Sequence, residues 1–192
     1  VGLSKETAHQ LGTPISSLMA WMDLLESSGV DPSLLSDMNK DVNRLSVIAE
    51  RFSKIGSKPE MELIYVNEVL ENATEYMRRR VSDKVLITTH LPSDAEGAMV
   101  CLSLFEWVIE NLCKNAVDAM NGEGRIDVYM TSEKQQIYID IKDTGKGIAR
   151  KNFKTVFNPG YTTKKRGWGL GLTLAKRIIE DYHAGRIYAV SY

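Results

Sequence analysis

The sequence predicts two units, an α-helical hairpin over residues 1–58 followed by an α/β sandwich over residues 59–192. Three observations predict this fold class. Apolar residues in the first unit repeat with a heptad period. In the second unit two segments alternate apolar and polar residues, as half-buried strands do, and a long amphipathic helical pattern precedes them. We expect the sandwich to contain a mixed, mostly antiparallel sheet with helices on one side.

One apolar seam runs along both helices of the first unit. In the first helix it is spaced 4-3-4-3, at Leu11, Ile15, Leu18, Met22 and Leu25. In the second helix the spacing is 3-4-3-4-3, at Leu35, Met38, Val42, Leu45, Ala49 and Phe52. Asp31 is suited to cap the second helix and Pro32 to open it, so a short turn joins two antiparallel helices. Because one hairpin leaves the stripe half covered, we expect a homodimeric four-helix bundle.

The segment from Gly56 to Pro59 ends the second helix and marks the boundary between the units. The elements expected beyond it are a strand at 63–66, a helix at 67–80, a strand at 85–91, a helix at 102–120, strands at 126–130 and 137–141, a helix at 171–182 and a strand at 186–192. The buried stripe of the 102–120 helix is predicted at Phe105, Val108, Ile109, Leu112, Ala116 and Ala119. Cys101 and Cys113 lack metal-like spacing, which predicts reduced core residues.

Composition narrows the functional classes. With 43% apolar residues, 26% charged residues and a net charge of −1, the chain has no global attraction to nucleic acid or to a membrane. The segment from Thr144 to Ile179 nevertheless contains no acidic residue and nine basic ones. Such a segment is either a solvated face or a surface for phosphates, and its glycines and hydroxyls favour phosphates. The chain begins at Val1 without a methionine and only eight residues before His9, so we expect a fragment of a longer protein, and no signal peptide is visible.

Polar residues form a stripe on the predicted 102–120 helix. Asn111, Asn115 and Asp118 lie at positions i, i+4 and i+7, with Lys114 beside them. Amide oxygens are hard, neutral donors that can complete the coordination shell of a Mg²⁺ ion already held by phosphate oxygens. An ordinary exposed helix face is the alternative interpretation.

Two glycine-rich segments follow that helix. Asp143 ends a strand, where its carboxylate can accept a hydrogen bond from an exocyclic amine, and Gly145 and Gly147 allow a base to approach the backbone closely. A simple Asp-Gly turn would give the same sequence. The second segment opens the 171–182 helix, where exposed amide groups suit phosphate; it contains Gly167, Gly169, Leu170 and Gly171. Between the two segments, Phe157, Thr163 and Lys164 belong to a predicted lid over a nucleotide.

His9 lies outside the heptad seam and is therefore expected to be exposed to solvent. Thr13 and Pro14 follow it, and the proline ring removes a helix hydrogen bond, which predicts a bend beside His9. An exposed histidine alone indicates nothing; its significance comes from these neighbours and from the nucleotide motifs downstream.

In this order, the segments resemble the cytoplasmic core of a sensor histidine kinase of two-component signalling over nearly the whole chain. That core consists of a dimerisation and histidine-phosphotransfer hairpin followed by an ATP-binding domain of the Bergerat type. The matching segments are His9 to Pro14 (H box), Asn111 to Asp118 (N box), Asp143 to Gly147 and Gly167 to Gly171 (glycine boxes), and Phe157 with Thr162, Thr163 and Lys164 (F box).

The resemblance implies ATP and Mg²⁺ as cofactors and assigns roles to residues. His9 would be the phosphoacceptor that attacks the γ-phosphate of ATP, and Thr13 would support dephosphorylation of the partner. Asn115 would bind Mg²⁺ with Asn111 beside it, Asp143 would bind the adenine amino group, and the three glycines of the second glycine box would shape the phosphate end. Lys164 would steer or clamp the phosphates. The phosphoryl group would then pass to an aspartate on the receiver domain of a response regulator.

Gln10 departs from the family, which usually has an acidic residue after the phosphoacceptor. Its amide oxygen can fix the tautomer of His9 but is a poor base. An ATP-sensing module with weak or no kinase activity is therefore the alternative. Another Bergerat-type ATPase, such as a chaperone or topoisomerase domain, would leave the hairpin unexplained. The resemblance also implies a cytoplasmic location within a larger sensor, attached to a membrane only through segments absent from this chain, and no nucleic-acid partner.

Overall fold

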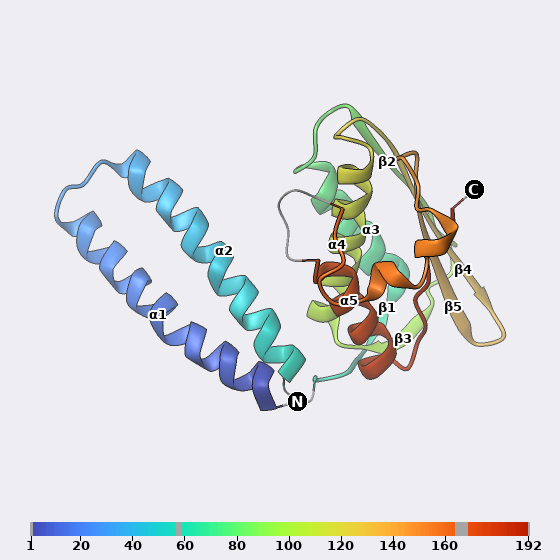
Figure 1. The fold of residues 1–192 in the computed structure, drawn as a ribbon, viewed down its shortest axis with the longest axis horizontal. Coiled ribbons are helices and arrows are strands. Elements are labelled where there is room, and N and C mark those ends of the chain that lie inside the picture. The colour runs from blue at the N-terminus through green and yellow to red at the C-terminus, as the bar shows by residue number, and fades with distance from the viewer. Residues whose placement is uncertain (1, 57–58, 164–168, 192) are drawn as a thin grey trace. The chain divides into compact units, whose positions relative to one another are not determined.

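This computed structural model describes residues 2–56, 59–163 and 169–191; within the first two helices, side chains are described for residues 13–43, 45–46 and 49. The chain separates into two compact units, Val1–Pro59 and Glu60–Tyr192 (Figure 1). Each unit is a body in its own right. Within the described residues, no helix is both long enough and apolar enough to cross a membrane.

The first unit contains helices α1 (Gly2–Ser27) and α2 (Pro32–Gly56), which pack against each other. Gly29 ends α1 with φ +79°, a left-handed conformation that glycine adopts without strain. Asp31 caps α2 as predicted, because its Oδ1 accepts a hydrogen bond from the Ser33 backbone N–H at 2.8 Å. This bond, followed by a bond from the Ser33 hydroxyl, lowers the pKa of the Asp31 carboxyl group.

The apolar seam divides into two rows. One row is buried between α1 and α2 and contains Ile15, Met22, Leu35, Val42 and Ala49. The other row is exposed and contains Leu18, Leu25, Met38 and Leu45, which are 37–47% exposed. The heptad pattern therefore covers more surface than one hairpin buries, which leaves an apolar face on each copy of the unit.

The second unit contains two small sheets. Strands β1 (Glu62–Tyr65) and β3 (Gly97–Val100) pair antiparallel. Strand β4 (Gly124–Glu133) lies between β2 (Val85–His90), which is parallel to it, and β5 (Gln136–Asp143), which is antiparallel. Among the described residues two of the three pairings are antiparallel, in accord with the predicted mixed sheet, but the strands form two sheets instead of one.

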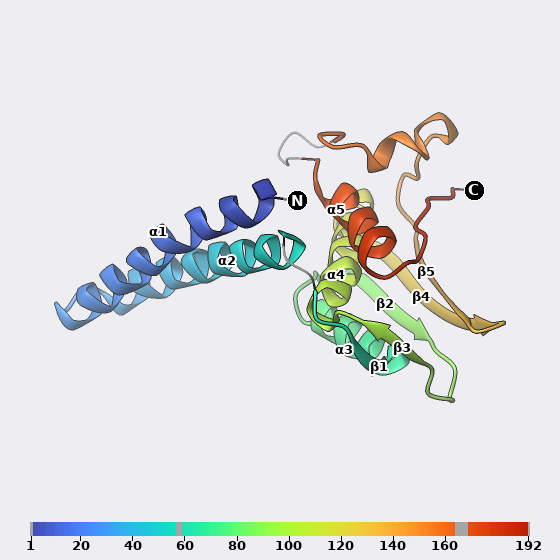
Figure 2. The same cartoon turned by 90° about the horizontal axis from the view of Figure 1, so that it is seen from below.

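Three helices cover one face of the β2–β4–β5 sheet (Figures 1 and 2): α3 (Val66–Arg78), α4 (Leu102–Ala119) and α5 (Gly171–Arg177). The last helix continues as one π-helical turn, Ile178–Tyr182. Fully buried side chains in the interior of this unit include Leu70, Leu104, Ile126 and Ile178. Each contributes about 1.5–3 kcal/mol relative to exposure. The β4–β5 end of the sheet and α4 therefore form a rigid base for the loops between them.

Both cysteines are free and buried, as predicted. Burial raises the pKa of the Cys113 thiol to about 12, with a smaller contribution from the Glu110 carboxylate. On α4 the buried stripe contains Leu104, Phe105, Val108, Ile109, Cys113 and Ala116. Leu112 and Ala119, which were predicted to belong to it, are half-buried at its margin.

One predicted strand was wrong and one strand was missed. The predicted final strand at 186–192 is not a strand in the described residues 186–191; this segment makes no backbone hydrogen bond to β5, and the Ser191 hydroxyl holds its end by accepting from Ile148 N–H at 3.3 Å. Strand β3 was not predicted, because Gly97 and Ala98 have low strand propensity and only pairing with β1 orders them.

Candidate functional site

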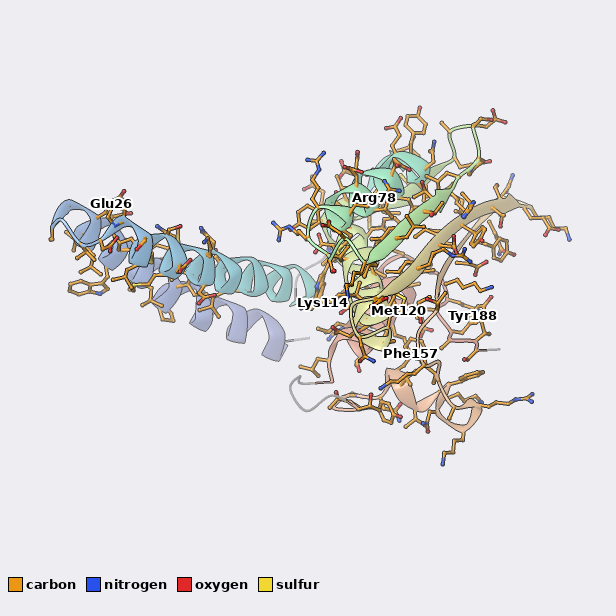
Figure 3. All side chains as sticks on the ribbon, turned by 90° about the horizontal axis from the view of Figure 1, so that it is seen from above. Glu26, Arg78, Lys114, Met120, Phe157 and Tyr188 are labelled. Carbon is orange, nitrogen blue, oxygen red and sulfur yellow. The ribbon has the colours of Figure 1, made fainter. Side chains whose placement is uncertain are left out.

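The polar stripe of α4 occupies the C-terminal half of that helix. Lys114 and Asp118 are exposed, and Asn111 and Asn115 are half-buried (Figure 3 labels Lys114). Asn111, Lys114, Asn115 and Asp118 thus share the part of α4 that faces away from the sheet, because the buried stripe occupies the opposite face. The predicted set of amide and carboxylate donors is therefore accessible from one side.

The loop after β5 packs directly onto the C-terminal end of α4. Asp143 Oδ1 accepts a hydrogen bond from Gly145 N–H at 2.8 Å, which leaves Oδ2 without a partner among the described residues. A Cβ atom at Gly145 would lie 2.8 Å from the carbonyl carbon of Ala119, so only glycine fits there. Gly147 has φ +68°, and a Cβ atom on it would lie 2.5 Å from Ser191 Oγ. This loop therefore holds the Asp143 carboxylate beside the polar stripe.

Thr144 is a structural member of this loop that sequence reasoning missed. Its backbone N–H donates to Arg125 O at 3.1 Å, and its Oγ1 accepts from Arg125 N–H at 3.0 Å. The same hydroxyl lies 3.3 Å from Met120 Sδ, which follows α4 (Figure 3). Thr144 therefore ties the loop to both β4 and α4. Its position directly after Asp143 was the available signal.

The second glycine segment lies against the first polar residue of the stripe. A Cβ atom at Gly171 would lie 2.5 Å from Asn111 Oδ1 and 3.1 Å from Asn111 Nδ2. Asn111 Nδ2 is buried and has no hydrogen-bond partner among the described residues. A buried amide donor without a partner is costly, so this position suits a ligand atom or a water molecule that accepts a hydrogen bond.

The base of the predicted lid is closed by the second glycine segment. Gly169 has φ +64°, and Gly160 N–H donates to Gly169 O at 3.1 Å. A Cβ atom on Gly169 would lie 2.6 Å from the Gly160 carbonyl carbon, which again requires glycine. Leu170 is half-buried, and Gly167 lies outside the described residues. The two ends of the lid are therefore joined beside α5.

Phe157, the predicted aromatic anchor of the lid, is buried in the domain, with 8% of its surface exposed (Figure 3). The Lys176 ammonium group of α5 lies 5.9 Å from the centre of its ring. Phe157 thus anchors the segment before the lid to α5. Thr163 is exposed, and Lys164 lies outside the described residues.

The segment between the two glycine motifs is strongly basic. Its exposed cations make no ion pair among the described residues; they are Lys146, Arg150, Lys151 and Lys154. Because no acidic residue occurs between 144 and 179, their charges reinforce one another. This edge of the site therefore attracts anions.

The predicted phosphoacceptor belongs to the other unit. His9 and Gln10 lie on α1, and their side chains are outside the described residues. Thr13 is exposed on the same helix, and its carbonyl oxygen accepts a hydrogen bond from Ser17 Oγ at 3.2 Å. The helix continues through Pro14. The structure therefore brings together the residues of α4, the loop after β5 and the start of α5, whereas the three residues on α1 form a separate group.

Comparison with known proteins shows which proteins this chain resembles. Residues 102–191 match the family described as histidine kinase-, DNA gyrase B-, and HSP90-like ATPase. The signal transduction histidine-protein kinase AtoS of Escherichia coli is 28% identical over 193 residues, which cover 96% of this chain and 31% of that protein. The chain spans about a third of the length of the curated relatives it matches.

Solved structures share the fold at low identity. Full-length ShkA in complex with AMPPNP gives a TM-score of 0.78 at 18% identity, covering 99% of this chain and 42% of that one. Histidine kinase ThkA in complex with response regulator protein TrrA gives a TM-score of 0.60 at 19% identity, covering 99% of this chain and 57% of that one. These likenesses establish the fold.

Proposed function

We propose that this chain is an ATP-dependent protein-histidine kinase, because residues 102–191 match the histidine kinase-, DNA gyrase B- and HSP90-like ATPase family and the chain is similar to histidine kinases. One observation carries the proposal. Three motifs separated in sequence meet around the C-terminal half of α4, where Gly145 packs on Ala119 and Gly171 packs on Asn111.

In this proposal the Asp143 loop binds adenine. Asp143 Oδ1 is held by Gly145 N–H, and the free Oδ2 accepts the hydrogen bond from the exocyclic amine of the base. Gly145 and Gly147 have no side chains, so the base can lie against the backbone. This division of the two carboxylate oxygens between loop and ligand keeps the acceptor in place before ATP binds.

The polar stripe and the second glycine segment bind the phosphates. Asn111 Nδ2, buried without a partner among the described residues, fits a phosphate oxygen or a bridging water. Asn115 provides an amide oxygen for Mg²⁺. Lys114 and Asp118 lie at the exposed margin of the stripe, where the Lys114 ammonium group contacts phosphate oxygens and Asp118 lies on the side of the metal. Bound there, Mg²⁺ would neutralise charge on the phosphates. Gly169 allows the lid to close against the nucleotide, and the lid residue Lys164 clamps the phosphates.

The transfer step joins the two units. A ring nitrogen of His9 forms a bond to the γ-phosphorus while the bond between that phosphorus and the departing ADP oxygen breaks. The attacking nitrogen uses its free lone pair, and the other ring nitrogen then loses its proton to solvent. Gln10 fixes this tautomer, because its amide oxygen accepts a hydrogen bond from that second N–H. Such a reaction depends mainly on positioning and electrostatic stabilisation, which a nucleotide domain presented to α1 can supply.

We further propose a homodimer and a receiver-domain partner. The exposed seam row of Leu18, Leu25, Met38 and Leu45 would be buried by a second copy in a four-helix bundle. The ThkA–TrrA complex supports a response regulator as the recipient of the phosphoryl group on one of its aspartates. Thr13, exposed near His9 in sequence, would serve the reverse activity by orienting water against the phosphorylated regulator.

Gln10 favours a second candidate function, an ATP-sensing module with weak or no transfer. Incubation with γ-labelled ATP and Mg²⁺ separates the two. A kinase predicts label that survives alkali, is lost in acid and is absent from His9→Ala protein, and Gln10→Glu should increase the rate of labelling. ATP binding without label would favour the sensing module, and labelled His9→Ala protein would exclude His9 as the acceptor.

A further inference from the structure

His183, directly after the π-helical turn, links two helices of the nucleotide domain. Its Nε2 accepts a hydrogen bond from the Cys101 backbone N–H at 3.0 Å, and its Nδ1 lies 2.8 Å from the Ile178 carbonyl oxygen. A carbonyl oxygen can only accept, so Nδ1 carries the ring proton and Nε2 is the acceptor. Two backbone groups therefore hold the neutral ring in one tautomer, with the ring of Phe105 tilted against it at 6.2 Å.

Cys101 stands immediately before α4, the helix of the polar stripe. The Cys101 side chain itself makes no capping hydrogen bond to this helix. The imidazole of His183 therefore connects the beginning of α4 with the end of the helical segment that opens at Gly171. This contact is far from the nucleotide residues, yet it joins the two helices that carry them.

The pair of helices is fixed at two points. Gly171 lies against Asn111, and His183 lies against Cys101. On α4 the contacts are ten residues apart, which corresponds to about 15 Å of helix. On the segment from Gly171 to His183 they are twelve residues apart, or about 18 Å. The order of the contacts is antiparallel, and α5 lies beside α4 in Figures 1 and 2. Together the contacts set both the register and the rotation of one helix against the other.

Apolar packing alone does not set this register. Ala175 and Ile178 are buried between the contacts, but burial is non-directional and tolerates small displacements. A hydrogen bond has a narrow range of distance and angle. We propose that His183 is a positioning residue that holds Gly169, Gly171 and the base of the lid over Asn111, and through them tunes nucleotide affinity. The inference rests on the proposed nucleotide-binding function.

Substitution of His183 by glutamine or asparagine distinguishes the two hydrogen bonds that its ring makes. In His183→Gln, the side-chain oxygen stands as many bonds from Cα as Nε2 does, so it can still accept from Cys101 N–H. In His183→Asn the amide reaches only as far as Nδ1, so the bond to Ile178 O survives and the link to α4 is lost. His183→Ala removes both. His90→Gln is the matched control, because His90 lies on the sheet and contacts Asp127 at 3.1 Å.

Calorimetry with Mg–AMPPNP, at a temperature well below each variant's Tm, tests the role. We expect Kd to rise about tenfold in His183→Asn and His183→Ala, and to stay within about threefold of wild type in His183→Gln and His90→Gln. Equal affinity of the Asn and Gln variants, or affinity that follows Tm across all four, would overturn the positioning role.

Two further measurements on the 1–192 chain distinguish failure of this inference from failure of the proposed function. Nitrogen-15 spectra of the histidine rings should show His183 protonated on Nδ1; a proton on Nε2 would refute the link, even if the variants do not fold. If wild-type protein binds no nucleotide, the proposed function fails. Hydrogen exchange of the Cys101 amide then tests the link to His183 by itself. We expect faster exchange in the Asn variant than in the Gln variant, and equal exchange would refute the link.

Discussion

Adding a single methyl group at Gly171 tests the contact between the second glycine segment and the polar stripe. Gly171 has an ordinary helical backbone, so alanine introduces no strain of its own. Its Cβ atom would, however, lie 2.5 Å from Asn111 Oδ1 and 3.2 Å from Asn111 Cγ. An ordinary contact begins at 3.4 Å, so the Asn111 amide must move by about 0.9 Å.

The cost follows from the packing around Asn111. Overpacking a filled site costs about 1–3 kcal/mol, and the better helix propensity of alanine returns up to about 1 kcal/mol. We therefore expect Gly171→Ala to destabilise the domain by about 0–3 kcal/mol. Nucleotide affinity should fall further, by about tenfold or more, because the displaced Asn111 amide no longer meets the phosphates.

A double-mutant cycle with Asn111→Ala isolates the contact. Denaturant unfolding gives the free energy of each of the four proteins, and the clash disappears when Asn111 is shortened. The destabilisation by Gly171→Ala should therefore vanish in the Asn111→Ala background, with a coupling equal to the cost of the clash, about 1–3 kcal/mol. Additive effects of the two changes, together with unaltered AMPPNP affinity of Gly171→Ala, would refute the contact and its role.

Three other changes test the account by calorimetry or unfolding. Asp143→Asn keeps the oxygen that accepts from Gly145 N–H but loses the second acceptor oxygen. The binding free energy of ATP should therefore weaken by about 1–3 kcal/mol, and the preference for ATP over ITP should disappear. An unchanged preference would place adenine elsewhere. Ala184→Gly should stabilise the domain by about 0.5–1 kcal/mol, because Ala184 has φ +51°, and lower stability would contradict this. The β4–β5 turn has positive φ at Lys134 and Gln135, so Asn-Gly at these positions should add about 1 kcal/mol, whereas no gain in the unfolding midpoint would mean that the turn is unstrained.

Local patterns in the sequence determined much of the fold. The heptad spacing correctly marked Ile15, Met22 and Val42 as buried, and the residue types of Asp31 and Pro32 correctly marked a helix cap, because these features depend on neighbours within a few turns. The same spacing did not separate the buried row from the exposed row. That division depends on how many helices share the seam, which one chain's pattern does not specify.

Long-range packing was harder to predict from the sequence. The chemistry of Asn111 and Asp143 followed from residue type and spacing, but the contact of Gly171 with Asn111 joins residues sixty positions apart. Strand β3 and the bond between His183 and Cys101 also arise only when distant segments meet. Thr144 was overlooked because a hydroxyl in a turn has many ordinary explanations.

In the proposed function, α4, the loop after β5 and the start of α5 form one nucleotide pocket. Amide chemical shifts of the 1–192 chain, measured as Mg–AMPPNP is added, show which residues respond to the nucleotide. One shared pocket predicts saturable shifts concentrated at Asn111–Asp118, Asp143–Gly147 and Gly169–Gly171, all with one Kd. Shifts confined to another surface, or different Kd values for the three segments, would contradict it.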